Sequence, residues 1–382
     1  MAGGNLGSRF GIYALSDGRG GFGQQTELCR DVIRLAHERG MDAFVLQPGF
    51  ARSRSRVSGY RLSRDGAFAP AACPWPDVVW RRVCCRPRAL RAQIADDEAA
   101  FHNARVFGLD QRFADKWKLH HFLRSLPDIA QYVPATRLLT RPSDLFTMLA
   151  LHGDVYVKPR NGTQGRGIAR VVTTIGLPRA RYELRDESGV RVLRESALRA
   201  WALHKPPARY IVQMAVAGAP AAAGERVYDA RLLLQHDDQA RPVCTATIGR
   251  VGARGAITSN LHSGGQAVAE EKLREWLMDG SLRRGHDPLA QARQLCERVF
   301  ADVVRIARGD VCELGMDIVF GRRAKPFLLE LNGCPGRRML RRTDPALRRL
   351  SLVRVLEYAD RVGRSPAQRD EWIREGTVYG GS

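Results

Sequence analysis

Features that would point to a membrane protein or a secreted protein are missing from this chain of 382 residues. Its longest charge-free and mostly apolar run, residues 215–224, is about half as long as a membrane-spanning helix requires. The first 16 residues contain one arginine and only a short apolar run, so they do not read as a secretory signal. We therefore expect a cytoplasmic protein without a membrane segment, and its length predicts two or three domains.

Cysteine pairs of the usual functional spacing are missing too. None of the eight cysteines forms a Cys-x-x-Cys motif, and the only close pair is Cys84 and Cys85. If these two lie in a strand, they point to opposite faces, which disfavours a disulfide between them. We expect reduced thiols that fill core positions, and no zinc site.

Lysine and aromatic residues are scarce, although the chain is strongly basic. The formal net charge is +21, but only six of the 61 basic residues are lysines, and aromatic residues make up 7%. The arginines are spread over the whole chain, and no helix-turn-helix, zinc-finger or RNP pattern is present, which argues against nucleic-acid binding. The charge then reflects an acidic substrate, an acidic partner surface or composition alone. A lysine that survives in such a chain is expected where a compact point charge is needed.

The order of apolar patterns indicates an α/β (α+β) protein with an N-terminal α/β domain at 1–112. Strands are expected there at 9–15, 42–46 and 77–83, and helices at 26–39 and 88–105. The glycine-rich segment 18–23 does not have G-x-G-x-x-G spacing, so we expect a turn there. A linker is expected at 106–113.

A second, larger domain is expected at 113–363, in two parts around 113–215 and 225–345, followed by a polar tail at 364–382. Helices are expected at 115–126, 142–151 and around 194–203, and from residue 155 the pattern is mainly that of strands. Two more helices are expected at 267–279 and 287–307, just before the closing strands at 312–320 and 326–331.

A strand carries Lys158 into a glycine-rich loop with Gly162, Gly165 and Gly167. Glycines let a phosphate chain approach backbone amides closely, and the lysine can reach a phosphate oxygen. The lysine precedes the glycines, and neither a Walker motif nor the other kinase motifs are present. The alternative is a β-hairpin turn with a lysine beside it by chance.

Oxygen-bearing side chains occur on two later strands. Glu330 and Asn332 are two residues apart and share one face of their strand, and an adjacent antiparallel strand could bring Asp317 beside them. Such oxygen ligands, together with nucleotide phosphates, suit Mg2+. The alternative is an acidic strand end that runs into a turn at Asn332-Gly333.

In this order, the motifs resemble those of the ATP-grasp superfamily from Asp115 to Pro335, with the 1–112 domain as its pre-ATP-grasp domain. The resemblance implies ATP and Mg2+ as cofactors, an Asp-Lys helix at 115–118, a hinge strand at 210–214 that bonds adenine, and a closing loop at 260–265. It implies that ATP is bound by Lys118, Lys158, Gly162, Gly165, Gly167, Gln213, Met214, Val216 and Asp229. It also implies that Asp317, Glu330 and Asn332 hold the metal.

Within this superfamily, the chain is most similar to the spore-coat-associated YheC/YheD group. The similar segments are Pro76–Arg82, Glu313–Asp317 and Asn332–Gly336. Trp80 stands where tyrosine is usual, Gly333-Cys334 replaces a commoner Ser-Lys, and an Ala/Gly insertion at 215–224 obscures the hinge.

The resemblance implies an ADP-forming ligase that joins a carboxylate to an amine, or a peptide ligase, through an acyl phosphate. Arg231, Arg250 and Asn260 are the expected catalytic residues, and Arg81, Arg82, His262, Gly264 and Gly265 the expected substrate residues. The substrates are expected to be small molecules or peptides, with an anionic group. Two alternatives are a spore-coat or surface protein that retains the fold, and a polyanion- or nucleic-acid-binding protein.

Overall fold

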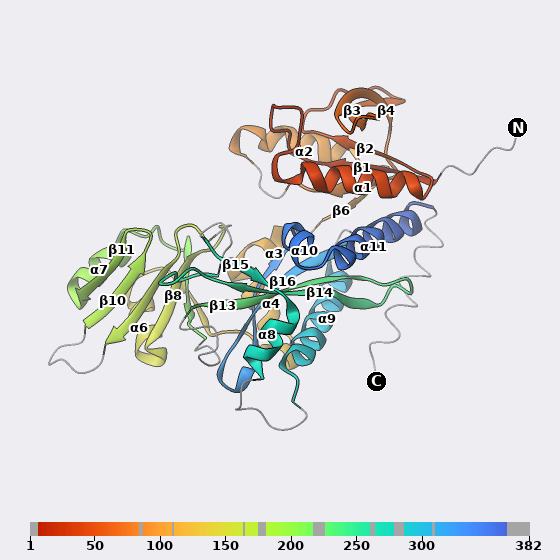
Figure 1. Cartoon of the computed structure of the whole chain (residues 1–382). Helices are drawn as coiled ribbons and strands as arrows, with labels where there is room; N and C mark the ends of the chain where they lie inside the picture. The colour runs from red at the N-terminus through yellow and green to blue at the C-terminus, as the bar shows by residue number, and fades with distance from the viewer. Residues whose placement is uncertain are drawn as a thin grey trace, which may run out of the picture.

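The structure is a computed structural model that describes residues 7–83, 87–108, 111–162, 165–174, 181–216, 226–259, 264–278, 286–307 and 310–364. No helix among these residues is long and apolar enough to cross a membrane. Three sheets organise the chain, one in an N-terminal domain and two in the remainder (Figure 1). The α/β class expected from the sequence is confirmed.

The N-terminal sheet has the strand order β4-β3-β2-β1-β5-β6, in which β2, β1, β5 and β6 run parallel. A β3–β4 hairpin extends it antiparallel. Helix α1 packs on one face and α2 on the other. The bounds are β1 Gly7–Tyr13, α1 Thr26–Glu38, β2 Met41–Leu46, β3 Arg56–Leu62, β4 Phe68–Pro74, β5 Val78–Arg81, α2 Arg91–Ala100 and β6 Arg105–Phe107.

The second sheet, sheet B, is antiparallel with the order β11-β10-β9-β8-β12-β7. Helices α6 and α7 bury its apolar face. The strand β8 carries Lys158 and is paired on one side with β12 and on the other with β9. The bounds are β7 Thr136–Leu139, α6 Pro142–His152, β8 Asp154–Pro159, β9 Ala169–Thr174, β10 Arg181–Asp186, β11 Gly189–Arg194, α7 Glu195–Leu203 and β12 Tyr210–Met214.

The third sheet, sheet C, is antiparallel with the order β15-β14-β13-β16-β17. Alternate residues such as Leu232 and Met316 pack against α4, α5, α8 and α9, so the residues between them face the opposite side. The bounds are α3 Gln111–Ala114, α4 Lys116–Arg124, α5 Pro127–Ala130, β13 Tyr228–His236, β14 Pro242–Val251, β15 Gln266–Val268, α8 Glu270–Leu277, α9 Pro288–Ile306, β16 Glu313–Phe320, β17 Pro326–Asn332 and α10 Arg338–Thr343.

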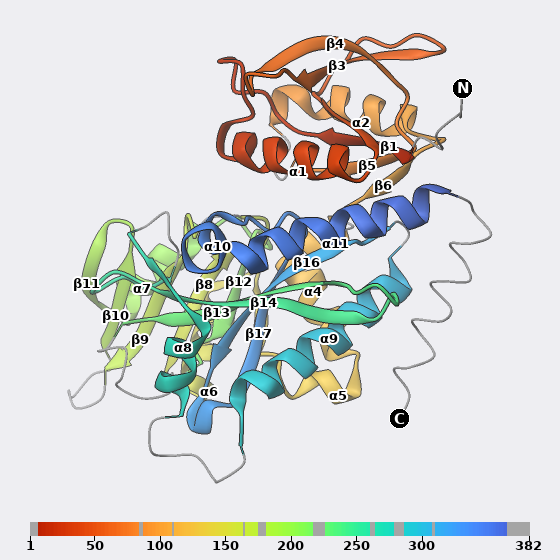
Figure 2. The same cartoon turned by 45° about the vertical axis from the view of Figure 1, so that its right-hand side comes forward.

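Helix α11, Pro345–Arg364, lies between the N-terminal domain and sheet C (Figure 2). Its apolar residues, including Val355 and Tyr358, belong to the same core as β1 and α1. The helix also contacts β13 and β14. A segment late in the chain therefore completes the core of the domain that the chain begins with.

Several elements differ from the sequence expectation. The hairpins β3–β4 and β10–β11 and the helix α11 were not expected, and the expected linker at 106–113 begins inside β6. The helix expected at 267–279 is preceded by the strand β15, which pairs with β14. Cys84 and Cys85 and the tail beyond Arg364 lie outside the described residues.

The glycine-rich turn at 18–23 follows the expectation. The backbone amides of Arg19, Gly21 and Gly23 donate to the carboxylate of Asp17 over 2.8–3.0 Å. The turn is thus closed by a carboxylate of its own.

Candidate functional site

Four charged side chains gather on the face of sheet C that is turned away from α9; we call them the four-charge cluster. They are Asp229 and Arg231 on β13, Arg250 on β14 and Asp317 on β16. Cross-strand register places Asp229 opposite Arg250 and Arg231 opposite Asp317. Arg231 donates to both Asp317 oxygens at 2.7 Å, and Arg250 donates to Asp229 at 2.6 and 2.5 Å. Nη2 of Arg250 also lies 2.9 Å from Asp317, so the four side chains form one continuous network.

The Asp317 carboxylate of this cluster is held in its charged form. Burial alone would raise the pKa of Asp317, but the charges and hydrogen bonds of Arg231 and Arg250 outweigh it and hold the pKa well below its usual range. Burial likewise would lower the pKa of Arg250, yet Asp229 and Asp317 raise it. Two guanidinium groups thus face two carboxylates within the cluster.

Lys158 on β8 of sheet B belongs to the same electrostatic environment. Its ammonium donates to Gln213 Oε1 at 2.7 Å and lies 5.1 Å from the centre of the Tyr156 ring. Burial, and then the charge of Lys116, lowers its pKa to about 8, although Glu330, Asp229 and Asp317 act in the opposite direction. A lysine so poorly solvated stands to gain from an additional anion.

Lys116, which the sequence analysis did not include among the expected site residues, lies beside the glycine loop and Glu330. It opens α4, whose N-cap Asp115 accepts from the amides of Trp117 and Lys118 and pairs with Arg160 at 2.7 Å. Its ammonium donates to the Gly162 carbonyl at 2.9 Å and lies 3.9 Å from Glu330 Oε2. The expected residue of this helix, Lys118, has an exposed side chain. The Asp115-Lys116 pair itself was the signal that could have identified the inner lysine.

The glycine loop follows β8 as expected, with residues 163–164 outside the described part. Gly165 and Gly167 have φ of 76° and 69°, a conformation that residues with a side chain rarely adopt. The Gly167 amide donates to Glu187 Oε1 at 2.8 Å, so a carboxylate occupies this donor.

The hinge strand β12 is less informative about adenine. The side chain of Gln213 is buried and is engaged with Lys158 and with Thr136, so it orients the lysine. The Met214 amide donates to the Ala135 carbonyl. Val216 lies beside the turn between β16 and β17, near Gly321.

The closing loop is only partly described. Asn260 and His262 lie outside the described residues. Gly264 is exposed, with a φ of 82°, and Gly265 is half-buried.

The two arginines at the end of β5 have different surroundings. The half-buried Arg81 pairs with Glu98 at 3.1 Å. Arg82 is only 2% exposed and donates to Glu313 and to the Pro335 carbonyl, both at 3.2 Å. Arg82 therefore lies inside the joint between the domains and not on a surface that a substrate could reach.

A family model described as YheC/D like ATP-grasp matches residues 105–361. The chain belongs to this family. Among its relatives is the endospore coat-associated protein YheD of Bacillus subtilis (strain 168), 23% identical over 317 residues that cover 78% of this chain and 65% of the relative. The chain thus spans a little under two thirds of that relative's length.

Solved structures agree on the fold of this YheC/D-like ATP-grasp protein. D-alanyl-alanine synthetase A of Vibrio cholerae has a TM-score of 0.51 at 12% identity and covers 98% of this chain and 99% of its own. Macrocyclase MdnC of Microcystis aeruginosa, bound with its precursor peptide MdnA, has a TM-score of 0.51 at 12% identity and covers 91% and 99%. The fold is that of ATP-grasp ligases.

The oxygen donors that an ATP-grasp protein would offer to Mg2+ lie on one face of sheet C. Asp317 is opposite Glu330, and Asn332 is opposite Gly315 on the same pair of strands. No group of three or more His, Cys, Asp or Glu side chains arranged to hold a metal occurs in the described residues, so the set depends on the Asn332 amide. An ionised Asp317 suits a metal, but a metal would have to share its oxygens with Arg231 and Arg250. The donor chemistry fits Mg2+ on these terms.

Proposed function

We propose that this protein is an ATP- and Mg2+-dependent ligase that joins a carboxylate to an amine, or elongates a peptide, and releases ADP. The observation that supports this best is the meeting of two sets of charge from different sheets. Lys158 of sheet B and Lys116 at the start of α4 both interact electrostatically with carboxylates of sheet C. On that sheet, Arg231, Arg250 and Asp229 are already ordered by ion pairs. A bound triphosphate would supply the anionic partner that both lysines could use.

In the proposed reaction, a substrate carboxylate oxygen bonds to the γ-phosphorus while the bond to the β–γ bridging oxygen breaks and ADP leaves. The amine nitrogen then bonds to the acyl carbon, the carbon–oxygen bond to phosphate breaks, and the amine loses a proton to solvent. Bound Mg2+, held by Asp317, Glu330 and Asn332, would neutralise phosphate charge.

Each cation has a task in this proposal. Lys158 and Lys116 hold the phosphates, together with amides of the glycine loop. Arg231, whose side chain is 18% exposed, contacts the transferring phosphoryl group, and the more deeply buried Arg250 holds it in place through Asp317. Asp229 is ion-paired with Arg250 and accepts a bond from Ser259 at 2.5 Å, so its contacts support a role in ordering the site more directly than the expected contact with ATP.

The substrates in this proposal are small-molecule or peptide carboxylates and amines, one of them anionic. The comparison structures act in this range, since one is a synthetase of D-alanyl-alanine and another binds a precursor peptide. Arg81 is the proposed contact for the anionic group. A cytoplasmic location, with association to a spore coat as in the relative YheD, is part of the same proposal.

The test combines binding with a turnover screen. Lys158→Ala should weaken Mg2+-ATP binding at least tenfold in calorimetry, about 1.4 kcal/mol. Lys272→Ala is the matched control, because Lys272 is an exposed lysine whose partner is Glu275 on the same helix. Release of ADP is then screened with pairs of amino acids and dipeptides. Equal ATP affinity in Lys158→Ala and the wild type would contradict the assignment of Lys158, and absence of Mg2+-ATP binding by the wild type would contradict the proposal as a whole.

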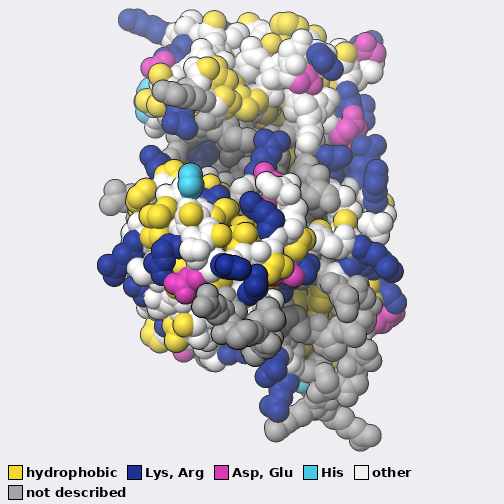
Figure 3. Space-filling model, turned by 90° about the vertical axis from the view of Figure 1, so that its left-hand side faces the viewer, with side chains coloured by type: hydrophobic (Ala, Val, Ile, Leu, Met, Phe, Trp, Pro, Cys, Tyr) yellow, Lys and Arg dark blue, Asp and Glu magenta, His cyan; other side chains and the backbone are white. Residues whose placement is uncertain are grey.

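Nucleic-acid binding is a weaker candidate for the basic surface. On the side of the molecule seen in Figure 3, lysine and arginine side chains are scattered over both the upper and the lower lobe, with acidic ones between them, and form no single stripe. Many of the arginines are also paired with carboxylates, as Arg61 is with Asp42 and Arg170 with Asp154. Tight and strongly salt-dependent retention on DNA or RNA would favour this alternative instead.

A further inference from the structure

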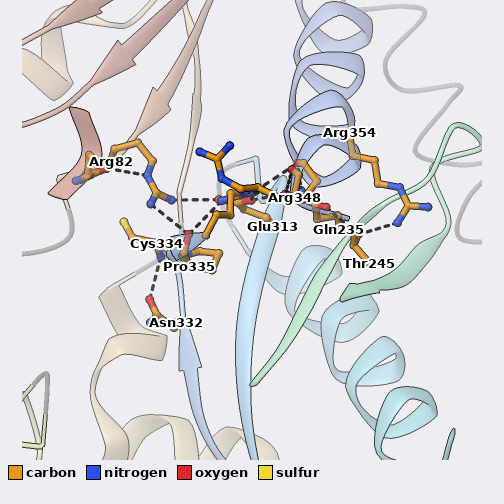
Figure 4. A network of polar contacts seen from close by, with 12 residues as sticks. Arg82, Gln235, Thr245, Glu313, Asn332, Cys334, Pro335, Arg348 and Arg354 are labelled. Carbon is orange, nitrogen blue, oxygen red and sulfur yellow. Dashed lines mark hydrogen bonds and ion pairs between the residues drawn. The ribbon is translucent and has the colours of Figure 1, made fainter. Parts of the chain in front are cut away.

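A second polar network lies on the same face of sheet C as the four-charge cluster, farther along the strands (Figure 4). We call it the joint network, because it contains Arg82 of the N-terminal domain, Glu313 at the start of β16, and Arg337 and the Pro335 carbonyl from the segment after β17. Arg82, Glu313 and Arg337 are each at most 3% exposed. Nothing in the proposed reaction uses these groups directly.

The network grips the segment that carries the last proposed metal ligand. The Pro335 carbonyl accepts from Arg82 Nη2 at 3.2 Å and from Arg337 Nη1 at 3.1 Å. Both guanidinium groups also bind the carboxylate of Glu313. Pro335 is three residues from Asn332, so two buried arginines fix the backbone beside the ligand.

The remaining sides of this segment are held as well. The Asn332 Oδ1 atom accepts from the Cys334 amide at 3.1 Å, and the Cys334 thiol lies 3.7 Å from the Arg81 carbonyl of the N-terminal domain. On β16, a Cβ atom at Gly315 would meet Pro335 Cβ at 3.2 Å and Asn332 Cβ at 3.5 Å. The glycine thus lets the segment fold back closely onto the strand.

One face of β16 connects the two networks. Glu313, Gly315 and Asp317 alternate along this face, so a structural carboxylate, a space for the Asn332 segment and a proposed metal ligand follow one another. Because Arg82 comes from the other domain, the position of Asn332 relative to Asp317 depends on how the N-terminal domain docks.

We propose that Arg82 and Arg337 are positioning residues that set the geometry of the Asn332 metal ligand and make it depend on the docking of the N-terminal domain. This rests on the proposed function for the identity of the metal site. It differs from a substrate role of Arg82, because it predicts a changed requirement for Mg2+ and not a changed Michaelis constant for the carboxylate.

The test uses the full chain with ADP and MgCl2 in calorimetry, so that no turnover is needed. Arg82→Met should raise the Mg2+ concentration required for half-maximal ADP binding at least fivefold, while ADP affinity without Mg2+ stays within twofold of the wild type. Arg82→Lys keeps the charge but lacks the planar fork that spans Glu313 and Pro335, so the same direction of change is expected. Arg354→Met is the matched control. Arg354 donates to Thr245, which is linked to Glu313 only through Gln235, and it does not touch the segment.

A second readout needs no nucleotide. Cys334 is half-buried in the gripped segment, so its rate of alkylation, followed by peptide mapping, reports whether the segment opens. Arg82→Met and Arg82→Lys should raise this rate severalfold, and Arg354→Met should leave it within twofold of the wild type.

The outcomes separate the two proposals. If the wild type binds ADP with a clear Mg2+ dependence but the folded Arg82 variants match it in both readouts, the positioning role is wrong and the proposed function stands. If the wild type binds no nucleotide, the proposed function fails and the positioning role fails with it.

Discussion

The four-charge cluster and the joint network occupy the same face of sheet C, with Leu233 and Gly315 between them, but they balance charge differently. The cluster sets two guanidinium groups against two carboxylates. The joint network has two guanidinium groups and one carboxylate, Glu313, and is less exposed.

The excess positive charge of the joint network is balanced by partners whose positions are fixed in the fold. Arg82 and Arg337 share the Pro335 carbonyl, and their Cζ atoms lie 4.7 and 5.5 Å from the centre of the Trp80 ring. Backbone and aromatic partners are fixed, whereas the carboxylates of the four-charge cluster can be shared with a metal or a phosphate-bound cation. The joint network therefore keeps fixed partners, whereas the four-charge cluster can exchange its partners.

The largest effect is expected from a substitution in the joint network. Glu313→Gln removes the negative charge that two buried guanidinium groups share, and should lower the free energy of unfolding by about 3–5 kcal/mol. Asp317→Asn should cost less, because Arg231 beside it is partly exposed and can be hydrated. Denaturant titration of both variants checks the order; a larger loss in Asp317→Asn would reverse the comparison.

The next largest effect concerns the proposed metal ligands beside the four-charge cluster. Glu330→Gln and Asn332→Ala should leave the fold intact but reduce turnover by about two orders of magnitude, because Mg2+ loses an oxygen ligand. Glu330 is half-buried with Lys116 as a distant partner, so little stability is at risk. Turnover is followed as ADP release, with unfolding curves as the control. Retention of most of the activity by either variant would place the metal elsewhere.

A pH dependence should follow from Lys158. Its pKa of about 8 means that the ammonium is charged below pH 8 and becomes neutral as the pH rises above it. Phosphate favours the charged form, so Mg2+-ATP affinity should fall as pH rises from 7 to 9, by up to about tenfold. Calorimetry at pH 8.5 in buffers of different ionisation enthalpy should detect proton uptake on binding. Uptake that persists in Lys158→Ala would assign it to another group.

The smallest effect tests the aromatic partner of the joint network. Trp80→Tyr replaces the indole with a smaller ring and should lower the free energy of unfolding by about 1 kcal/mol, because the smaller ring attracts the two guanidinium groups less. Thermal unfolding gives the value. A double-mutant cycle with Arg82→Met then separates the causes. If the effect of Trp80→Tyr disappears in the Arg82→Met background, the ring acts through the arginine; an unchanged effect would attribute it to packing alone.

The sequence predicted the parts of the site that follow local rules. Glu330 and Asn332 share a face because they are two residues apart, and the glycines mark the turn after Lys158. The family was also predicted from motif order, and the family match confirms it. The catalytic and ligand roles of these residues stay predictions.

What the sequence did not predict depends on contacts across long stretches of chain. The pair of Arg82 and Glu313 joins residues 231 positions apart, and no periodicity marks it. For the same reason Arg82 was assigned to substrate, since a strand end beside a cleft looks the same whether its side chain points into solvent or into a domain joint. The sequence favoured Lys118 over Lys116 because only the contact between the start of α4 and the segment after β8 decides which lysine faces inward.

The scarce lysines show how far composition can guide such an assignment. Lys116 and Lys158 lie at the proposed phosphate site. Lys205 instead lies over Trp201 and Tyr210, and Lys325 over Tyr132 and Phe327. Among these four lysines an aromatic pair is thus as frequent a partner as the proposed phosphate, whereas Lys118 and Lys272 are exposed.

The position of α11 has a consequence for how the chain is made. The N-terminal domain is synthesised first, yet part of its core comes from Leu352, Val355 and Leu356 of this helix. While the ribosome is still translating, the part of the apolar face of the β1 sheet that α11 covers stays exposed, which does not happen in chains that fold domain by domain. Folding of the first domain is thus tied to the arrival of residues more than 300 positions later. A stalled or clipped chain would leave this face as a target for chaperones and proteases.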